Sequence, residues 1–329
     1  MKPLFILFTA LTLFLQAGNF LIWAEADEAA GSREVSQFRG KESEHNCGDC
    51  HEVIAEQYAR SSHSASYSNP FYQKLIEKLP KEKILRCNRC HLPRPLFFNG
   101  RVPKLSATGR TVIKDGIGCT TCHQTKDSVM LGPFDAVESP HMSRNSKLFT
   151  QSATCAVCHG EGEFDLVKSW KDGGFSDTEC IECHMPQTSG KAVQHFSFIN
   201  LPDRDIGNHL FPASNSLEMV ERSVAVDVAA TKGGLRLVIT NSGAGHLVPG
   251  GRYRAFRLTV WRQNENGIEK EIFTARISKD RRNRLPPGGS LSFQVKIKKG
   301  AKARVQLEYL NLLSQNSTEG LVVFNERYE

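Results

Sequence analysis

The spacing of apolar residues divides the chain into three parts. Near the start, an interrupted apolar run extends from Leu4 to Trp23. Between Phe71 and Leu79 apolar side chains recur at helical spacing, and Pro80 follows where a helix would end. From Val224 onward apolar and polar residues alternate, which is the period of a half-buried strand. The pattern predicts a leader, a region of short helices and a β-rich C-terminal part.

The C-terminal part contains seven short segments with strand period. Turn residues such as Gly233-Gly234 and Pro286-Pro287 separate several of them. Seven strands in about a hundred residues predict an antiparallel β-sandwich of immunoglobulin-like type over residues 218–329. Because the strands carry no catalytic pattern, we expect a structural or docking module. The expected strands span 224–228, 235–239, 256–260, 272–277, 291–297, 305–309 and 321–324.

Residues 1–26 are predicted to be a cleaved secretory signal peptide. Ala24 and Ala26 are small residues at the two positions that a signal peptidase reads. The alternative is an uncleaved membrane anchor, but Gln16 and Gly18 interrupt the apolar run. No later segment is apolar enough to cross a membrane. We therefore expect an exported protein, periplasmic or extracellular in a bacterium.

All ten cysteines belong to five Cys-x-x-Cys-His motifs. Two thiols at this spacing can add to the two vinyl groups of one haem, and the adjacent histidine can bind the iron as the proximal ligand. Disulfides would explain the even number of cysteines but not the histidine after each pair, and tetrahedral zinc sites would leave one pair unused. We predict five haem c groups attached at Cys47/Cys50, Cys87/Cys90, Cys119/Cys122, Cys155/Cys158 and Cys180/Cys183, with proximal ligands His51, His91, His123, His159 and His184.

The motif region is too short to form an ordinary core. Residues 47–184 leave roughly 30 residues for each haem, too few to bury a side-chain core of their own. We therefore expect residues 27–200 to form a pentahaem cytochrome c domain in which short helices and loops wrap around the cofactors. Frequent Gly and Pro between the motifs favour turns over a sheet. Residues 201–217 are predicted to be an irregular connector.

The histidines outside the motifs decide what the haems could do. A haem with two protein ligands transfers electrons, whereas an open sixth position can bind and transform a small molecule. Six of the eleven histidines lie outside the motifs, which is enough to close five haems. His45, close to Cys47, is expected not to bind, and His246 is expected to reach in from the β-rich part. The candidate distal ligands are His63, His141, His195, His209 and His246.

Several runs around the motifs are distinctive. They are Glu56-Gln57-Tyr58, Ser61-Ser62-His63, Asp115-Gly116-Ile117-Gly118, Ser139-Pro140-His141 and His184-Met185-Pro186. With these runs, residues 45–200 resemble the multihaem cytochromes of the cytochrome c-554 type, which are related in haem arrangement to hydroxylamine oxidoreductase and pentahaem nitrite reductase. Residues 245–250 resemble part of a β-domain attached to many such bacterial cytochromes. The resemblance implies closely packed haems, in parallel and perpendicular pairs, with mostly bis-histidine ligation.

The charge of the chain does not indicate a nucleic-acid partner. The formal net charge is +7, but five ferric haems would add ten propionate charges and about five positive charges, which leaves a net charge of about +2. The basic cluster from Lys279 to Arg284 is expected to be a solvated loop rather than part of a binding stripe. We expect no nucleic acid partner.

The motifs and the free histidines together predict a non-catalytic role. We expect an exported pentahaem cytochrome that relays electrons between redox-partner proteins, a donor and an acceptor that the sequence does not identify. One alternative is an oxidoreductase with one open haem that acts on a small nitrogen or sulfur compound. A second is a subunit of a conducting haem filament. Peripheral membrane association and a homo-oligomer are left open.

Overall fold

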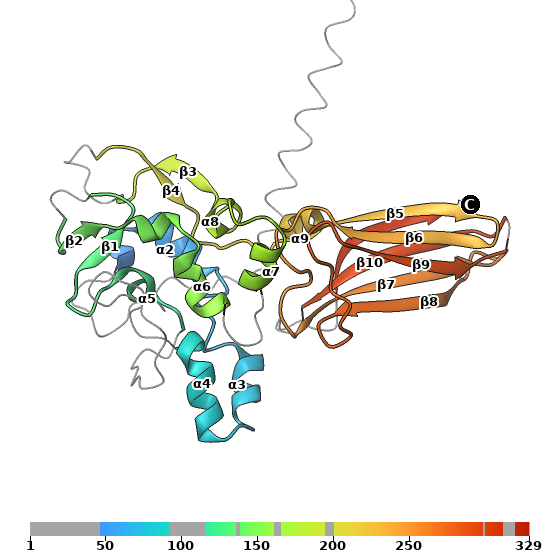
Figure 1. Cartoon of the computed structure of the whole chain (residues 1–329), viewed down its shortest axis with the longest axis horizontal. Coiled ribbons are helices and arrows are strands. Elements are labelled where there is room, and N and C mark those ends of the chain that lie inside the picture. Colours follow the sequence, from blue (N-terminus) through green and yellow to red (C-terminus); the bar gives the residue numbers. More distant parts are fainter. Residues whose placement is uncertain are drawn as a thin grey trace, which may run out of the picture.

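The structure is a computed structural model, and it places a helical part beside an elongated β part (Figure 1). The predicted signal peptide, His45 and His195 lie outside the described residues. The described residues are 47–92, 116–135, 139–160, 166–194, 201–298, 300–311 and 320–328.

Four motifs lie on short helices that end at the motif's histidine, and the first motif begins on a 3-10 helix that ends before Cys50 and His51. The two cysteines and the histidine occupy positions i, i+3 and i+4, which share one face of a helix. The helical turn therefore presents both thiols and the imidazole on the same side. The motif helices are η2 (Cys47–Asp49), α4 (Lys81–His91), α5 (Cys119–His123), α6 (Ala153–His159) and α8 (Cys180–His184).

The remaining helices of this part are also short. They are α2 (Glu52–Ala59), α3 (Pro70–Ile76), η3 (Lys147–Thr150) and α7 (Leu166–Asp172). The helix expected over residues 71–79 is present as α3, but it ends three residues earlier, in a turn that leads to Pro80. Its start is fixed by Asn69, whose Oδ1 accepts hydrogen bonds from the backbone N–H groups of Phe71 and Tyr72.

Two small sheets in the helical part differ from the prediction of turns alone. β1 (Met130–Gly132) pairs in parallel with β2 (Ser143–Asn145), and β3 (Gln187–Gly190) pairs antiparallel with β4 (Arg204–Gly207). β4 lies in the predicted connector, so residues 201–217 are not a plain irregular link. Strands of three or four residues carry too little alternation to be recognised from sequence.

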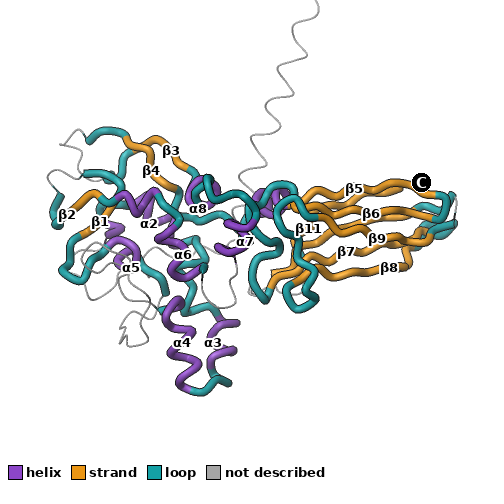
Figure 2. Tube along the Cα trace, viewed as in Figure 1, coloured by secondary structure: helices purple, strands orange, loops and turns teal. Residues whose placement is uncertain are grey.

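The β part consists of seven antiparallel strands in two sheets, preceded by α9 (Leu217–Ser223). One sheet has the order β5-β6-β9, and the other has the order β11-β10-β7-β8 (Figure 2). All seven strands expected from the alternation are present. They are β5 (Val224–Thr231), β6 (Gly234–Asn241), β7 (Arg254–Gln263), β8 (Glu269–Ser278), β9 (Ser290–Lys296), β10 (Ala303–Asn311) and β11 (Leu321–Tyr328).

The two sheets share one apolar core. Leu237 on β6, Leu258 on β7 and Leu307 on β10 are fully buried in it. Leu258 and Leu307 are cross-strand partners, so the register of β7 and β10 aligns their inward faces. In the described helical part, by contrast, buried apolar side chains are few. They are Tyr58, Ala59, Tyr72, Ile76, Val129 and Leu131.

None of the helices in the described residues combines the length and the apolar character that crossing a bilayer requires.

Candidate haem sites

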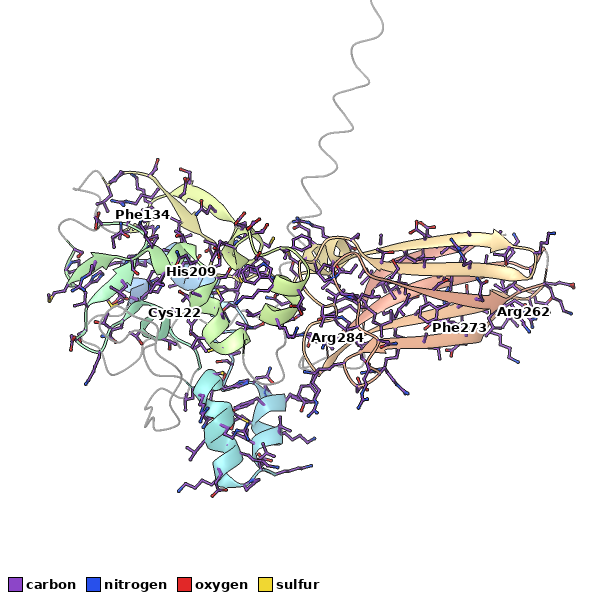
Figure 3. The ribbon with its side chains drawn as sticks, viewed as in Figure 1. Cys122, Phe134, His209, Arg262, Phe273 and Arg284 are labelled. Carbon is purple, nitrogen blue, oxygen red and sulfur yellow. The ribbon has the colours of Figure 1, made fainter. Side chains whose placement is uncertain are left out.

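A single large cavity connects the five motifs. It has a volume of about 2860 Å³ and is lined by both cysteines and the histidine of every motif. A pocket for one small ligand typically has a volume of roughly 300–1,000 Å³. If this cavity is divided equally among the five motifs, each has about 570 Å³. Cys122 and His209 lie among the side chains of the helical part that surround it (Figure 3). The space fits several large cofactors rather than one.

The motif thiols are not used in cross-links. All ten cysteines lie in the described parts of the chain, and none forms a disulfide. Among the same residues, no three His, Cys, Asp or Glu side chains converge as metal ligands would. The motifs therefore have the arrangement of separate attachment points along a cavity.

Backbone carbonyls fix the orientation of four proximal imidazoles. In each, Nδ1 lies at hydrogen-bond distance from a carbonyl oxygen, so that this nitrogen carries the proton and Nε2 keeps its lone pair for a metal. The distances are 2.7 Å from His51 to Ala192, 2.7 Å from His91 to Ser66, 2.8 Å from His123 to Leu131 and 2.8 Å from His184 to Pro212.

Four motif histidines each face a second imidazole. Metal–imidazole bonds are about 2.0–2.1 Å long, so two imidazoles on opposite sides of one metal have ring centres roughly 6 Å apart. The observed pairs have this separation. Their ring centres are 6.5 Å apart for His51 and His141, 6.1 Å for His159 and His63, 6.2 Å for His123 and His209 and 6.2 Å for His184 and His246.

These pairs bring together residues that are distant in sequence. His63, His141, His209 and His246, all candidates from the sequence, each lie opposite a different motif. The fifth candidate, His195, lies outside the described residues. Within the described residues, no second imidazole of this kind faces His91.

His63 lies in a tight turn that contacts the segment immediately before the third motif. Its carbonyl oxygen accepts hydrogen bonds from the N–H groups of Ser66, at 3.1 Å, and Ile117, at 3.2 Å. Gly116 makes this approach feasible, because a Cβ there would lie 2.8 Å from the His63 oxygen. Its φ of +134° is also a conformation that other residues rarely adopt.

His209 follows β4 directly, so the β3–β4 pairing sets its position. Its backbone N–H donates to Oε1 of Gln57 on α2 at 3.0 Å, and its Nδ1 lies 2.8 Å from the Gly207 oxygen. Phe211, two residues on, places its ring centre 4.5 Å from that of His63 and 5.8 Å from that of His209. One aromatic ring thus lies between the histidines opposite the third and fourth motifs.

His246 comes from a loop of the β part. Asn241 shapes this loop, since its side chain donates to the carbonyl oxygens of His246, at 2.9 Å, and Leu285, at 3.2 Å, and accepts from the Ala244 N–H at 3.0 Å. The N–H of Leu247 donates to Oγ of Ser169 on α7 at 3.0 Å. The loop is therefore tied to both parts of the chain.

His141 lies nearer the surface than the other three. Its Nδ1 is 2.8 Å from Oγ of Ser143, the first residue of β2. The short β1–β2 ladder thereby positions this imidazole opposite His51.

Burial keeps these imidazoles neutral. It lowers the pKa of His63, His159 and His209 to about 4 each. Burial also lowers the pKa of His123 and His246. Neutral imidazole is the form that binds a metal, so these side chains are ready to act as ligands at neutral pH.

Contacts between motif cysteines place the motifs side by side. The thiols of Cys47 and Cys119 interact by a hydrogen bond, which lowers the pKa of Cys47 to about 7. The thiols of Cys155 and Cys180 interact in the same way, which lowers the pKa of Cys180 to about 6. The first and third attachment points are therefore adjacent, and so are the fourth and fifth.

Two aromatic residues also support the motif imidazoles, and one of them, Tyr72, belongs to the helix expected over residues 71–79. The ring of Tyr72 stacks on His91 with the ring centres 4.0 Å apart and the planes 7° apart. Phe149 stacks on His123 at 4.7 Å and 12°. No local sequence signal marks Phe149 or the partner of either ring, because the stacking partners come from separate helices.

Comparison with known proteins agrees with this geometry. Residues 46–124, which contain the first three motifs, match the family described as cytochrome c554 and c-prime. The penta-heme cytochrome c552 from Thermochromatium tepidum has a similar fold, with a TM-score of 0.62 and 16% sequence identity over 86% of this chain and 97% of that one. No curated protein matches the chain.

The similar structure spans both the helical part and most of the β part, since it covers 86% of the chain. At 16% identity it bears on the fold alone. The family match covers residues 46–124, which is about a quarter of the chain. Residues 46–124 therefore resemble the cytochrome c554 and c-prime family, and the fold of the chain is similar to that of a penta-heme cytochrome c552.

Proposed function

We propose that the chain is an exported electron-transfer protein that carries five haem c groups and relays electrons between redox partners. When bound, haem supplies an iron that exchanges one electron without making or breaking covalent bonds to a substrate. The five Cys-x-x-Cys-His motifs along one cavity support five attachment sites. Export agrees with the typical location of c-type cytochromes and with the predicted signal peptide.

The single observation that carries the proposal is the set of four imidazole pairs. In our assignment His141, His63, His209 and His246 are the distal ligands opposite His51, His159, His123 and His184. A haem closed on both sides by imidazole has no position for a substrate, so four of the five sites would serve electron transfer. For the site at His91, His195 is the candidate left by the sequence.

The residues also support an order for the relay. The contacts Cys47–Cys119 and Cys155–Cys180 place the first motif beside the third and the fourth beside the fifth. Phe211 lies between the distal candidates of the third and fourth sites. We infer the order first, third, fourth, fifth, with the second motif as a branch.

The β part would then be more than a docking module. It supplies His246 to the fifth site, and its loop is tied to α7 through Leu247 and Ser169. We infer an immunoglobulin-like relationship for this part. Its strand order matches that of an immunoglobulin constant domain except that the fourth strand, β8, pairs with β7 at the edge of the other sheet.

Carbon monoxide binding tests the relay against catalysis. Carbon monoxide binds ferrous haem only where the sixth position is open or weakly held. We expect intact-protein mass spectrometry to find five haems per chain, and a carbon monoxide titration to alter the spectrum of at most one of them. Binding to two or more haems would contradict the ligand assignment.

The same titration tests the alternative that the chain is an enzyme with an open haem at the second motif. If exactly one haem binds carbon monoxide, and replacing Tyr72 beside His91 alters that signal, the open site lies at the second motif. A sample with no carbon monoxide binding would leave the relay as the function of all five sites.

A further inference from the structure

The helical hairpin that carries the second motif is strongly basic. This basic hairpin, residues 70–92, comprises α3, the turn at Pro80 and α4. It contains six Lys and Arg residues and two Glu residues, so it holds +4 of the chain's net charge of +7. Figures 1 and 2 show α3 and α4 side by side, projecting from the body of the molecule.

The base of the basic hairpin is firmly held. The Tyr72 hydroxyl on α3 donates to Oδ1 of Asn88 on α4 at 2.7 Å, and its ring stacks on His91. Phe71 meets the ring of Tyr253, in the β part, edge to face at 4.9 Å. The hairpin is therefore a fixed projection, and its charges are presented in a defined geometry.

One face of α4 has the composition of a docking surface. Leu85 is 42% exposed, and Lys81 and Arg89 lie one helical turn before and after it on the same face. Lys78, Lys83 and Arg86 are also exposed on the hairpin, together with Glu77 and Glu82, so the projection presents a net positive surface that includes Leu85.

The basic side chains at the tip are available to a partner. Within the described residues, no carboxylate lies within ion-pair distance of Lys78, Lys81 or Lys83. α4, which carries Lys81 and Lys83, continues directly into Cys87 and Cys90, the attachment residues of the second motif. A protein docked on this face would lie next to that haem site.

We propose that the basic hairpin is the docking surface for an acidic redox protein that exchanges electrons with the chain at the second motif. The proposal rests on the proposed function as an electron relay. Charge complementarity identifies the partner's chemistry, because an acidic surface would be steered to a projection that carries a net charge of +4. An anionic membrane fits less well, since Leu85 is the sole large exposed apolar side chain on the hairpin.

The test measures electron transfer from an acidic protein and from an uncharged molecule. The acidic donor is a reduced plant-type [2Fe–2S] ferredoxin, which loses one electron as one ferric haem becomes ferrous, and the uncharged donor is reduced lumiflavin. The K78E/K81E/K83E variant reverses three charges on the basic hairpin. The matched control, K232E/K296E/K298E, makes the same change in net charge at exposed lysines of the β part.

We expect the hairpin variant to react with ferredoxin at least about 10-fold more slowly than the wild type at about 20 mM ionic strength, where screening extends over roughly 20 Å. The difference should fall severalfold at about 200 mM, where the screening length is roughly 7 Å. The control should change the rate less than about twofold, and lumiflavin should reduce all three proteins at the same rate.

Three outcomes would overturn the proposal. The first is an equal loss of rate in both variants, which would mean that only net charge matters. The second is an unchanged rate in the hairpin variant. In the third, the hairpin variant alone loses binding to vesicles that contain anionic lipid, while its rate with ferredoxin is unaffected. That result would identify the hairpin as a membrane-binding surface instead. Slow lumiflavin reduction of the wild type would count against the relay itself and not against the docking surface.

Discussion

Replacing His246 with alanine tests the tie between the β part and the haem sites. The His246 ring centre lies 6.2 Å from that of His184, and the two ring planes differ by 15°. In our assignment His246 supplies one of ten axial ligands, so its removal should open one site of five. About 20% of the iron should change from low spin to high spin, because the weaker ligand field of five-coordinate iron favours the high-spin state.

Electron paramagnetic resonance of the ferric protein at low temperature measures this fraction. Added imidazole should enter the space left by the side chain and restore the low-spin signal, which a merely unfolded site would not allow. His45→Ala serves as the control, since we expect His45 not to bind. Circular dichroism would show that the β part of the His246 variant remains folded.

The reasoning would be refuted if the His246→Ala protein stayed fully low spin with an unchanged spectrum. It would also be refuted if the high-spin fraction spread over several haems, because the structure places His246 opposite His184 alone.

Three further substitutions probe the supports of these sites. Asn241→Ala removes three hydrogen bonds of the His246 loop and should lower the free energy of unfolding by about 3 kcal/mol. Chemical denaturation measures this loss, with the haem spectrum as a second readout, and an unchanged unfolding curve would contradict the role of Asn241. Gly116→Ala places a Cβ 2.8 Å from the His63 oxygen and should raise the fraction of high-spin iron by up to one fifth relative to the wild type. An unchanged electron paramagnetic resonance spectrum would show that the turn tolerates a side chain. Leu258→Ala in the fully buried core should cost about 2–5 kcal/mol in thermal unfolding of the β part, and an unchanged unfolding temperature would contradict the packing described for this core.

The sequence predicted those features that depend on short-range patterns. Alternation located all seven strands of the β part, and the motif spacing identified each thiol pair and its histidine as one attachment point. These patterns repeat over a few residues, so neighbouring positions carry the whole signal. The same local reasoning failed for β4, because four residues in a Pro- and Asn-containing segment show no clear period.

Pairing between distant residues could not be predicted in this way. The sequence supplied the distal candidates but did not assign any of them to a motif. His51, for example, is oriented by the carbonyl oxygen of Ala192, which is 141 positions away in the chain. His209 depends on the β3–β4 pairing, and the loop of His246 is held by Ser169 on α7, which accepts from the Leu247 N–H across 78 positions of sequence. Such contacts arise from the folded topology, and they cannot be predicted from the residue types involved.

The central claim is that imidazole pairs close at least four of the five haem sites. Spin quantitation by electron paramagnetic resonance of the fully oxidised protein, set against the haem content of the same sample, tests it most directly. The account predicts five haems per chain and low-spin iron for at least four fifths of them. A low-spin fraction clearly below four fifths in the folded protein would contradict it.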